Sequence, residues 1–419
     1  MTAAETKSPQ DKDKITGYMW IVLIVSLMAY VFDALEVMLY SNALVDIKAD
    51  FDFNFTGSGL VMTLSLLGYG VGGIFWGPQT DKLGRIKVMI ITVLGYAAFT
   101  GLTALSWNAA SLIGFRFLMG FFAGGEWAAG AALLTETWPA KYRGKIMGVM
   151  QCGWPLGAIL ASAVYTAISP SFGWRAVFLT GVIPAVIVLF IQVKIKEPEA
   201  FVQKKELEKQ GLQEKVSWTE IFKGKLLKRT TLFMLISFIG LMGYWCIITW
   251  IPTMLRTEGG LGVSATAIWF ILINLGCAAG YISFGFVSDK VGRRLSFTIY
   301  WLLAMILAPI FVSLSTSSSM MLPIGVLMGA SMGYFTGYPL YGSELFPTRL
   351  RATGMGIAYT GIGRLGSTLG PTVIGIIADN YSFSVAITAM ASLYIIAVIL
   401  IWVMGIETKG KSLEELENL

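Results

Sequence analysis

Apolar runs of about 20 residues alternate with short polar segments along almost the whole chain. A helix of that length spans the ~30 Å hydrocarbon core of a lipid bilayer. The pattern therefore predicts an all-α membrane protein with twelve transmembrane helices. The predicted spans are residues 17–40, 58–77, 86–106, 109–135, 144–168, 173–194, 229–255, 264–288, 295–315, 319–341, 353–378 and 382–405.

The charged residues between the runs predict how the chain divides and how it faces the bilayer. Lysine and arginine gather in alternate loops, and loops of this kind stay on the cytoplasmic side. We therefore expect cytoplasmic tails at 1–16 and 406–419, six-helix bundles at 17–194 and 229–405, and a charged cytoplasmic linker at 195–228.

Two segments of the first half recur in the second half at one spacing. Gly77–Lys87 recurs from Gly285 to Arg294, an offset of 208 residues (285 − 77 = 208). A second segment repeats at the same offset (344 − 136 = 208) and comprises Glu136, Pro139 and Arg143, matched by Glu344, Pro347 and Arg351. Because two different segments share one spacing, the chain is a duplicated unit, and we expect two pseudo-symmetric bundles.

Composition narrows the chemistry that the chain can perform. The sequence is 55% hydrophobic and only 13% charged, against about 25% charged residues in soluble domains. Histidine is absent, which excludes imidazole relays, histidine metal sites and Ser-His catalysis, so any proton chemistry falls to carboxylates. The three cysteines lie inside apolar runs at no metal or redox spacing. We therefore expect no metal and no cofactor. We also expect no nucleic-acid partner, because the net charge of +6 lies in the short loops, where it reflects membrane topology.

The repeated segments carry a family resemblance. The pattern G-x-x-x-D-[KR]-x-G-R-[RK] is intact at Gly285–Arg294 and has Ile86 in place of a basic residue in the first copy, and it resembles the signature of the major facilitator superfamily. Within that family, three further segments resemble metabolite:proton symporters of the sialate/lactate branch, and two are similar to sugar porters. The first three are Gly124–Gly130, Glu136–Pro139 and Gln151–Gly157, and the other two are Lys196–Glu199 and Glu407–Gly410.

Charged residues at the cytoplasmic helix ends form a candidate gate. Carboxylates and cations recur in both halves at the same spacing, so ion pairs among them could hold the cytoplasmic side shut in one state and release it in another. The alternative is that they serve only loop topology and solubility. The candidate gate residues are Asp81, Arg85, Glu136, Arg143, Asp289, Arg293, Glu344 and Arg351.

Two charged residues lie at similar depths in the first and fourth predicted helices. Asp33 lies about 8 residues, or roughly 12 Å, from the outer end of its span, and Arg116 lies about 7 residues in from the same side. We expect the two to pair. The resemblance implies that such a pair is the proton switch of the family, with Asp33 as the proton carrier. The alternative is a static ion pair that fastens the two helices together.

Two more acids lie in the first-half spans. Asp33-x-x-Glu36 is similar to the Asp-Gly-x-Asp of aromatic-acid symporters, with Ala34 and Glu36 in place of Gly and Asp. Glu36 is a further candidate for proton coupling; the alternative is that it is only solvated, because it lies nearer the outer mouth. Glu126 lies near the middle of the fourth helix and could be a second proton site, an acceptor for a substrate hydroxyl or a tie to a neighbouring helix.

Arg364 is the candidate for binding the substrate. It lies close to the bilayer midplane, where transporter sites are found, and no acid of the second half is expected at its depth. A guanidinium without a partner can bind a carboxylate with two hydrogen bonds. The alternative is structural pairing with Glu126 or with backbone carbonyls. Further candidates for the pocket, which could equally be packing residues, are Tyr30, Gln151, Trp245, Asn274, Tyr334 and Tyr338.

Taken with the resemblance, these patterns predict a secondary active transporter rather than an enzyme. We expect proton-coupled symport of a small organic anion, either a monocarboxylate or a sugar or aromatic acid, by a monomer in the cell membrane that is driven by the proton gradient. A carrier of sugars or other neutral metabolites, with Arg364 structural, and an organic-anion exchanger remain alternatives.

Overall fold

The computed structural model describes residues 15–182, 218–314, 316–347 and 354–409, together with positions 197, 202, 206 and 350. The described chain is built from helices and short connections, so the predicted all-α fold is confirmed. Eight of its helical segments are long and apolar enough to cross a membrane. Most of the predicted tails, most of the linker at 195–228 and residues 183–194 of the predicted sixth span lie outside the described residues.

The helices of the first half follow the predicted spans, with one important difference. They are α1 (Gly17–Asp50), α2 (Phe55–Leu83), α3 (Arg85–Ala104), α4 (Ala109–Thr137), α5 (Ala140–Gln151) and α6 (Gly153–Thr180). Together α5 and α6 form one span as far as Gly173, whose φ of 75° breaks the helix and starts the sixth span. The difference is that α1 continues ten residues beyond the predicted end at 40.

Several spans of the second half are broken into two helices. The elements are η2 (Trp218–Phe222), α9 (Gly224–Ile248), α10 (Ile251–Thr257), α11 (Val263–Val291), α12 (Arg293–Ser313), α13 (Met321–Ser331), α14 (Tyr334–Leu345), η3 (Gly356–Gly363), α16 (Arg364–Asn380), α17 (Phe383–Ala391) and α18 (Tyr394–Val403). The first membrane helix of this half begins at Gly224, five residues before the predicted start at 229.

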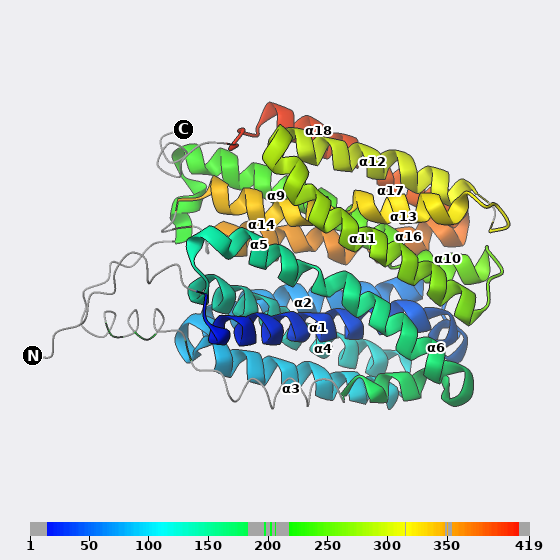
Figure 1. Cartoon of the computed structure of the whole chain (residues 1–419). Coiled ribbons are helices and arrows are strands. Elements are labelled where there is room, and N and C mark those ends of the chain that lie inside the picture. Colours follow the sequence, from blue (N-terminus) through cyan, green and yellow to red (C-terminus); the bar gives the residue numbers. More distant parts are fainter. Residues whose placement is uncertain are drawn as a thin grey trace, which may run out of the picture.

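The two halves lie side by side, with first-half helices in the lower part of Figure 1 and second-half helices in the upper part. Contacts between them run through α2 with α16, α6 with α11 and α1 with α10. Gly84 and Gly292 belong to the two copies of the first repeated segment, which we call the cassette. The end of the molecule that holds both copies is the cassette end. The end where α1 finishes and α2 begins is the opposite end.

Glycines allow close helix packing at equivalent places in the two halves. A Cβ atom added at Gly68 or Gly72 of α2 would clash with the backbone carbonyl of Phe117 or Phe121 of α4. Gly276 and Gly280 of α11 make the same kind of contact with the backbone of α13. Each lies 208 residues after its counterpart in α2 (276 − 68 = 208, 280 − 72 = 208). The duplication therefore extends to how the helices pack, because only glycine lets the backbones approach this closely.

We predict that Gly120→Ala destabilises the protein. Its added methyl group would meet the carbonyl oxygen of Ser65 in α2, and overpacking of this kind costs roughly 1–3 kcal/mol. Thermal unfolding of the purified protein in detergent measures the effect as a lowered midpoint.

Gly114→Ala is the matched control on the same helix. Nothing lies within 4 Å of its added Cβ, and alanine favours helix over glycine by about 1 kcal/mol, so the midpoint should stay or rise slightly. Equal midpoints for the two variants would contradict the close packing of α2 against α4.

Candidate functional site

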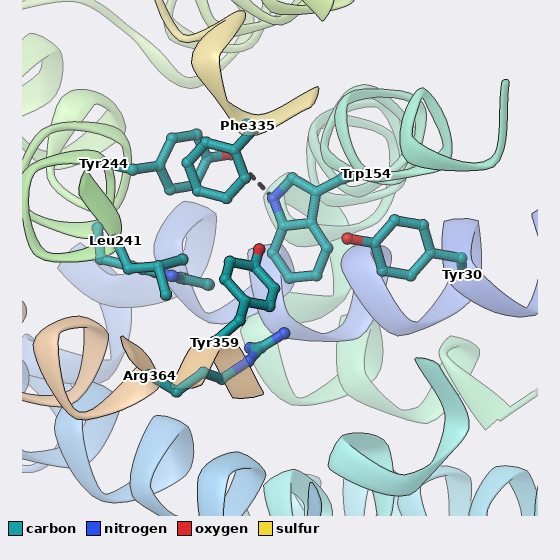
Figure 2. Close-up of a pocket in the computed structure, with 8 residues that line it drawn as sticks. Tyr30, Trp154, Leu241, Tyr244, Phe335, Tyr359 and Arg364 are labelled. Carbon is teal, nitrogen blue, oxygen red and sulfur yellow. Dashed lines mark hydrogen bonds between the residues drawn. The ribbon is translucent and has the colours of Figure 1, made fainter. Parts of the chain in front are cut away.

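A small cavity lies between the two halves and is walled mainly by aromatic rings (Figure 2). Its volume is about 10 Å³, which is room for about one water molecule. The lining comprises Tyr30 of α1 and Trp154 of α6 from the first half, and Leu241, Tyr244 and Trp245 of α9, Phe335 of α14, Tyr359 of η3 and Arg364 of α16 from the second half.

Rings from the two halves interlock around this cavity. The indole Nε1 of Trp154 donates a hydrogen bond of 2.8 Å to the hydroxyl of Tyr244, as Figure 2 shows. Trp154 also lies edge-on to Trp245, with ring centroids 5.6 Å apart, and Tyr244 packs against Phe335 at 4.5 Å. Edge-to-face pairs of this kind fix the orientation of each ring. The cavity is therefore a shaped site, closed in this conformation.

Arg364 brings a buried positive charge to the cavity. It is the first residue of α16, directly after the π-helical segment η3, and a π-helical turn often marks a functional site. Its side chain extends past Tyr359 toward the first half in Figure 2. Its Nε atom is buried without a partner, and within the described chain Arg364 forms no hydrogen bond or salt bridge. Its guanidinium instead lies 3.8 Å from the ring centre of Tyr69.

Tyr69 connects this arginine to Asp33. The hydroxyl of Tyr69 donates a hydrogen bond of 2.8 Å to Oδ2 of Asp33, while Oδ1 is buried without a partner in the described chain. Asp33 is fully buried. Two helices of the first half thus hold an acid and a tyrosine directly beside the arginine of the second half.

The predicted pairing of Asp33 with Arg116 is wrong. Because α1 ends at Asp50, Asp33 lies 17 residues, or about 26 Å, from that end (50 − 33 = 17). Arg116 lies only 7 residues, or about 10 Å, from the start of α4 (116 − 109 = 7). Arg116 therefore contacts the next turns of α1. It donates to the backbone carbonyl of Glu36 at 3.3 Å and lies over the ring of Tyr40 at 5.2 Å.

The other two acids are buried as well. Glu36 is 1% exposed and accepts a hydrogen bond from Thr100 of α3, so the alternative of a solvated Glu36 is wrong. Glu126 is fully buried, and neither of its carboxyl oxygens has a partner in the described chain. It lies 17 residues from the start of α4 (126 − 109 = 17), at the depth of Asp33, and the two acids interact electrostatically.

The remaining candidates for the pocket divide into two groups. Tyr30 and Trp245 line the cavity, whereas the prediction that Tyr334 and Tyr338 do so is wrong. The Tyr334 hydroxyl donates to the Gly240 carbonyl at 3.0 Å and that of Tyr338 to the Ile236 carbonyl at 3.1 Å, so both pack inside the second half.

Asn274 and Gln151 are buried but do not line this cavity. The amide nitrogen of Asn274 donates to the Phe270 carbonyl one turn earlier in its own helix. Sequence reasoning missed six residues of the site, Tyr69, Trp154, Leu241, Tyr244, Phe335 and Tyr359. Two had a signal: Trp154 lies in the Gln151–Gly157 segment, and Tyr69 is the one tyrosine in the glycine-rich stretch of α2.

The candidate gate residues that the structure describes lie mainly in the second half. Arg293 pairs with Glu344 at 2.7 Å and with Asp289 at 3.2 Å, all within that half. Arg85 donates to the Thr80 carbonyl at 3.2 Å. The side chains of Asp81, Glu136 and Arg143, and residue Arg351, lie outside the described parts, so the gate stays a prediction.

Each Gly-Arg turn at the cassette end is capped by a glutamate from farther along the chain. Gly84 and Gly292 have φ of 107° and 93°, which favour glycine. Glu197 accepts from the backbone N–H groups of Arg85 and Ile86, both at 3.0 Å, and Glu407 accepts from those of Arg293 and Arg294. Burial opposes the charge of Glu407, but these backbone donors hold the pKa of its carboxyl below the usual value.

The opposite end is held closed by contacts between the halves that the sequence did not indicate. Asp379, at the end of α16, accepts from the backbone N–H groups of Phe55 and Thr56 at 3.0 and 2.8 Å and caps α2. Partial burial favours the neutral acid, but the hydrogen bonds from Thr56 prevail and lower the pKa of Asp379. Beside it, Arg256 of α10 pairs with Asp46 of α1 at 2.9 Å.

Comparison with known proteins decides what this arrangement belongs to. Residues 26–364 match the Major Facilitator Superfamily. The chain belongs to this superfamily. A facilitator of this kind is a multi-pass membrane transporter and not an enzyme, which confirms the predicted family and class.

Relatives and solved structures agree along the whole length. The chain is 32% identical over 411 residues to a Haemophilus influenzae protein named for metabolite transport, covering 96% of this chain and 100% of that one. It is 28% identical to the cis,cis-muconate transport protein of Acinetobacter baylyi (93% and 95% covered) and 28% identical to the sialic acid transporter NanX of Escherichia coli (92% and 93%). The inward-open xylose transporter XylE of E. coli has the same fold, with a TM-score of 0.75 at 16% identity over 96% of this chain and 99% of that one.

We predict that Asp379→Ala opens the opposite end of this facilitator. The substitution removes the cap that joins α16 to α2. In a variant without Cys152, Cys246 and Cys277, Thr63→Cys serves as the probe, because Thr63 lies 2.8 Å from Thr372 across the interface between the halves. The rate of maleimide labelling should rise several-fold.

Asp50→Ala is the matched control, since Asp50 bonds to Trp174 and Arg175 within the first half. It should leave the labelling rate of Thr63→Cys unchanged. A rise of equal size in both variants would show that the contacts of Asp379 do not close the interface.

Proposed function

We propose that this facilitator carries a small organic anion together with protons, and that Arg364 binds the carboxylate of the substrate. The observation that carries the proposal is a buried guanidinium at a cavity between the halves, without a salt bridge among the described residues. A charge at membrane depth is costly and is kept where it serves function. A carboxylate is the natural partner, because it accepts two parallel hydrogen bonds from arginine.

The walls of the cavity support an acid with a flat, unsaturated body. The ring faces of Trp154, Trp245 and Phe335 offer apolar surface, and the hydroxyls of the lining tyrosines offer only a few polar contacts. Among the described lining residues, none carries an amide or a carboxylate, the groups that would satisfy the many hydroxyls of a neutral sugar. The names of the muconate and sialic acid relatives also specify carboxylic acids.

The acids of the first half support coupling to protons. Asp33, Glu36 and Glu126 are all buried in the first half, and Arg116 donates to the backbone carbonyl of Glu36. Several buried carboxyl groups cannot all be ionised at low dielectric, so this half can hold protons. Asp33 lies nearest to the substrate site, since it reaches Arg364 through Tyr69. Asp33 is therefore the proton carrier in this proposal.

Alternating access completes the mechanism. The opposite end is closed by Asp379 and Arg256, and rocking of the two halves would release it and expose the cavity to that side. We place the cassette end in the cytoplasm, on the argument of its basic loops. Substrate and proton bias the same rocking equilibrium, and this shared bias couples their movements.

We predict that Arg364→Ala lowers uptake of the acid at least a hundredfold, and that Arg364→Lys lowers it by about tenfold. Lysine keeps the charge but cannot form two parallel hydrogen bonds with one carboxylate. The measurement is uptake into proteoliposomes with an imposed proton gradient, using labelled cis,cis-muconate, 4-hydroxybenzoate and sialic acid as probes. Competition by the amide of the transported acid as strong as by the acid itself would favour a neutral-substrate carrier.

We also predict that Asp33→Asn abolishes uphill accumulation and keeps exchange. The amide cannot take up a proton, whereas counterflow of labelled against unlabelled acid needs no net proton movement. Both are measured in the same proteoliposomes. Gradient-driven accumulation that persists in this variant would remove Asp33 from the role of proton carrier.

A further inference from the structure

We infer that Tyr69 is the positioning residue that couples anion binding at Arg364 to protonation of Asp33. The inference rests on the proposed function and adds the link between its two sites. Tyr69 contacts both groups at once: its ring lies 3.8 Å from the guanidinium carbon, and its hydroxyl donates to Asp33 at 2.8 Å. It is the point where the second half meets the acid of the first half.

Tyr69 is buried and held both at its backbone and at its hydroxyl. The residue is 1% exposed, its backbone carbonyl packs so close to Gly124 of α4 that no larger residue fits there, and its hydroxyl donates to Asp33. Among the described residues, Asp33 and Arg364 form no direct ion pair, and Tyr69 contacts both. Movement of the arginine therefore changes its contact with a ring that is anchored in the first half.

An incoming carboxylate competes with this ring for Arg364. The described chain gives the guanidinium a ring face but no hydrogen bond, and a bidentate, charge-assisted pair with a carboxylate is stronger than a cation–π contact. Binding of the anion therefore draws Arg364 away from Tyr69. The anion also neutralises the positive charge on Arg364, which lies against the same tyrosine that is hydrogen-bonded to Asp33. A carboxyl group takes up a proton more readily once a nearby positive charge is neutralised.

Asp33 then takes up one proton from the bulk solution. Oδ1 is buried in this conformation and has no partner in the described chain, whereas Oδ2 keeps the hydrogen bond from the Tyr69 hydroxyl, which stays protonated, so the proton goes to Oδ1. The hydroxyl thus holds the carboxyl in one orientation. The titratable and charged groups that act on Asp33 are Tyr30 and Glu36 of α1, Tyr69 of α2, Tyr96 of α3, Glu126 of α4 and Arg364 of α16.

Tyr69→Phe tests the link, because it keeps the ring under Arg364 and removes only the hydroxyl. In proteoliposomes with labelled cis,cis-muconate, 4-hydroxybenzoate and sialic acid as probes, we compare the loss of counterflow with the loss of coupled transport in the same variant. Gradient-driven accumulation and acid-dependent proton entry, followed with internal pyranine, should each fall at least tenfold more than counterflow does. Tyr300→Phe is the control, since it removes another hydroxyl, hydrogen-bonded to Ser283 in the second half.

A second measurement needs no transport. Addition of the transported acid to purified protein in weakly buffered detergent solution should cause proton uptake by wild type and at least fivefold less by Tyr69→Phe. Wild-type coupling in Tyr69→Phe, or equal losses of counterflow and accumulation, would overturn the link while the proposed function stands. If wild-type protein accumulates none of the probes, the proposed function itself fails.

Discussion

A positive charge held between two halves of a membrane protein, without an ion pair in the described chain, is the constraint around which this facilitator is arranged. Arg364 rests on the ring of Tyr69 and faces a cavity walled by aromatic side chains. Burial makes the charge costly, so its energy depends strongly on any anion that arrives. The same charge acts on Asp33 through the low-dielectric interior. In the function that we propose, one guanidinium therefore binds the substrate and influences the proton site.

The rest of the fold keeps that charge in position. Glycine seams bring α2 against α4 and α11 against α13, and they recur at the offset of the duplication. Such seams make each half a stiff body, because backbones in direct contact cannot slide without a clash. The halves meet each other through polar contacts, through aromatic rings and through close backbone contacts of Gly59 and Gly375 between α2 and α16. Stiff halves with a separable interface are what a rocking transporter needs.

The two copies of the duplicated unit have taken different tasks. The first half holds the buried acids Asp33, Glu36 and Glu126, while the second supplies Arg364 and most of the aromatic wall. The two ends of the molecule also differ. At the cassette end, the ion pairs of Arg293 stay within one half, whereas at the opposite end Asp379 and Arg256 reach across to the other half. The described contacts thus close the opposite end.

The sequence alone determined the helical spans, the duplication and the presence of buried charges such as Arg364, because apolar run length and repeat spacing are properties of one dimension. The sequence could not predict which side chains of different helices contact each other, because these contacts depend on where each helix ends and how it is rotated. Because α1 is ten residues longer than predicted, Asp33 lies at a different depth from Arg116. Because of the rotation of its helix, Tyr338 packs inside the second half instead of lining the cavity. Only the tertiary structure placed Tyr69 in contact with both Asp33 and Arg364, because that position joins two consecutive helices of the first half to α16 of the second half.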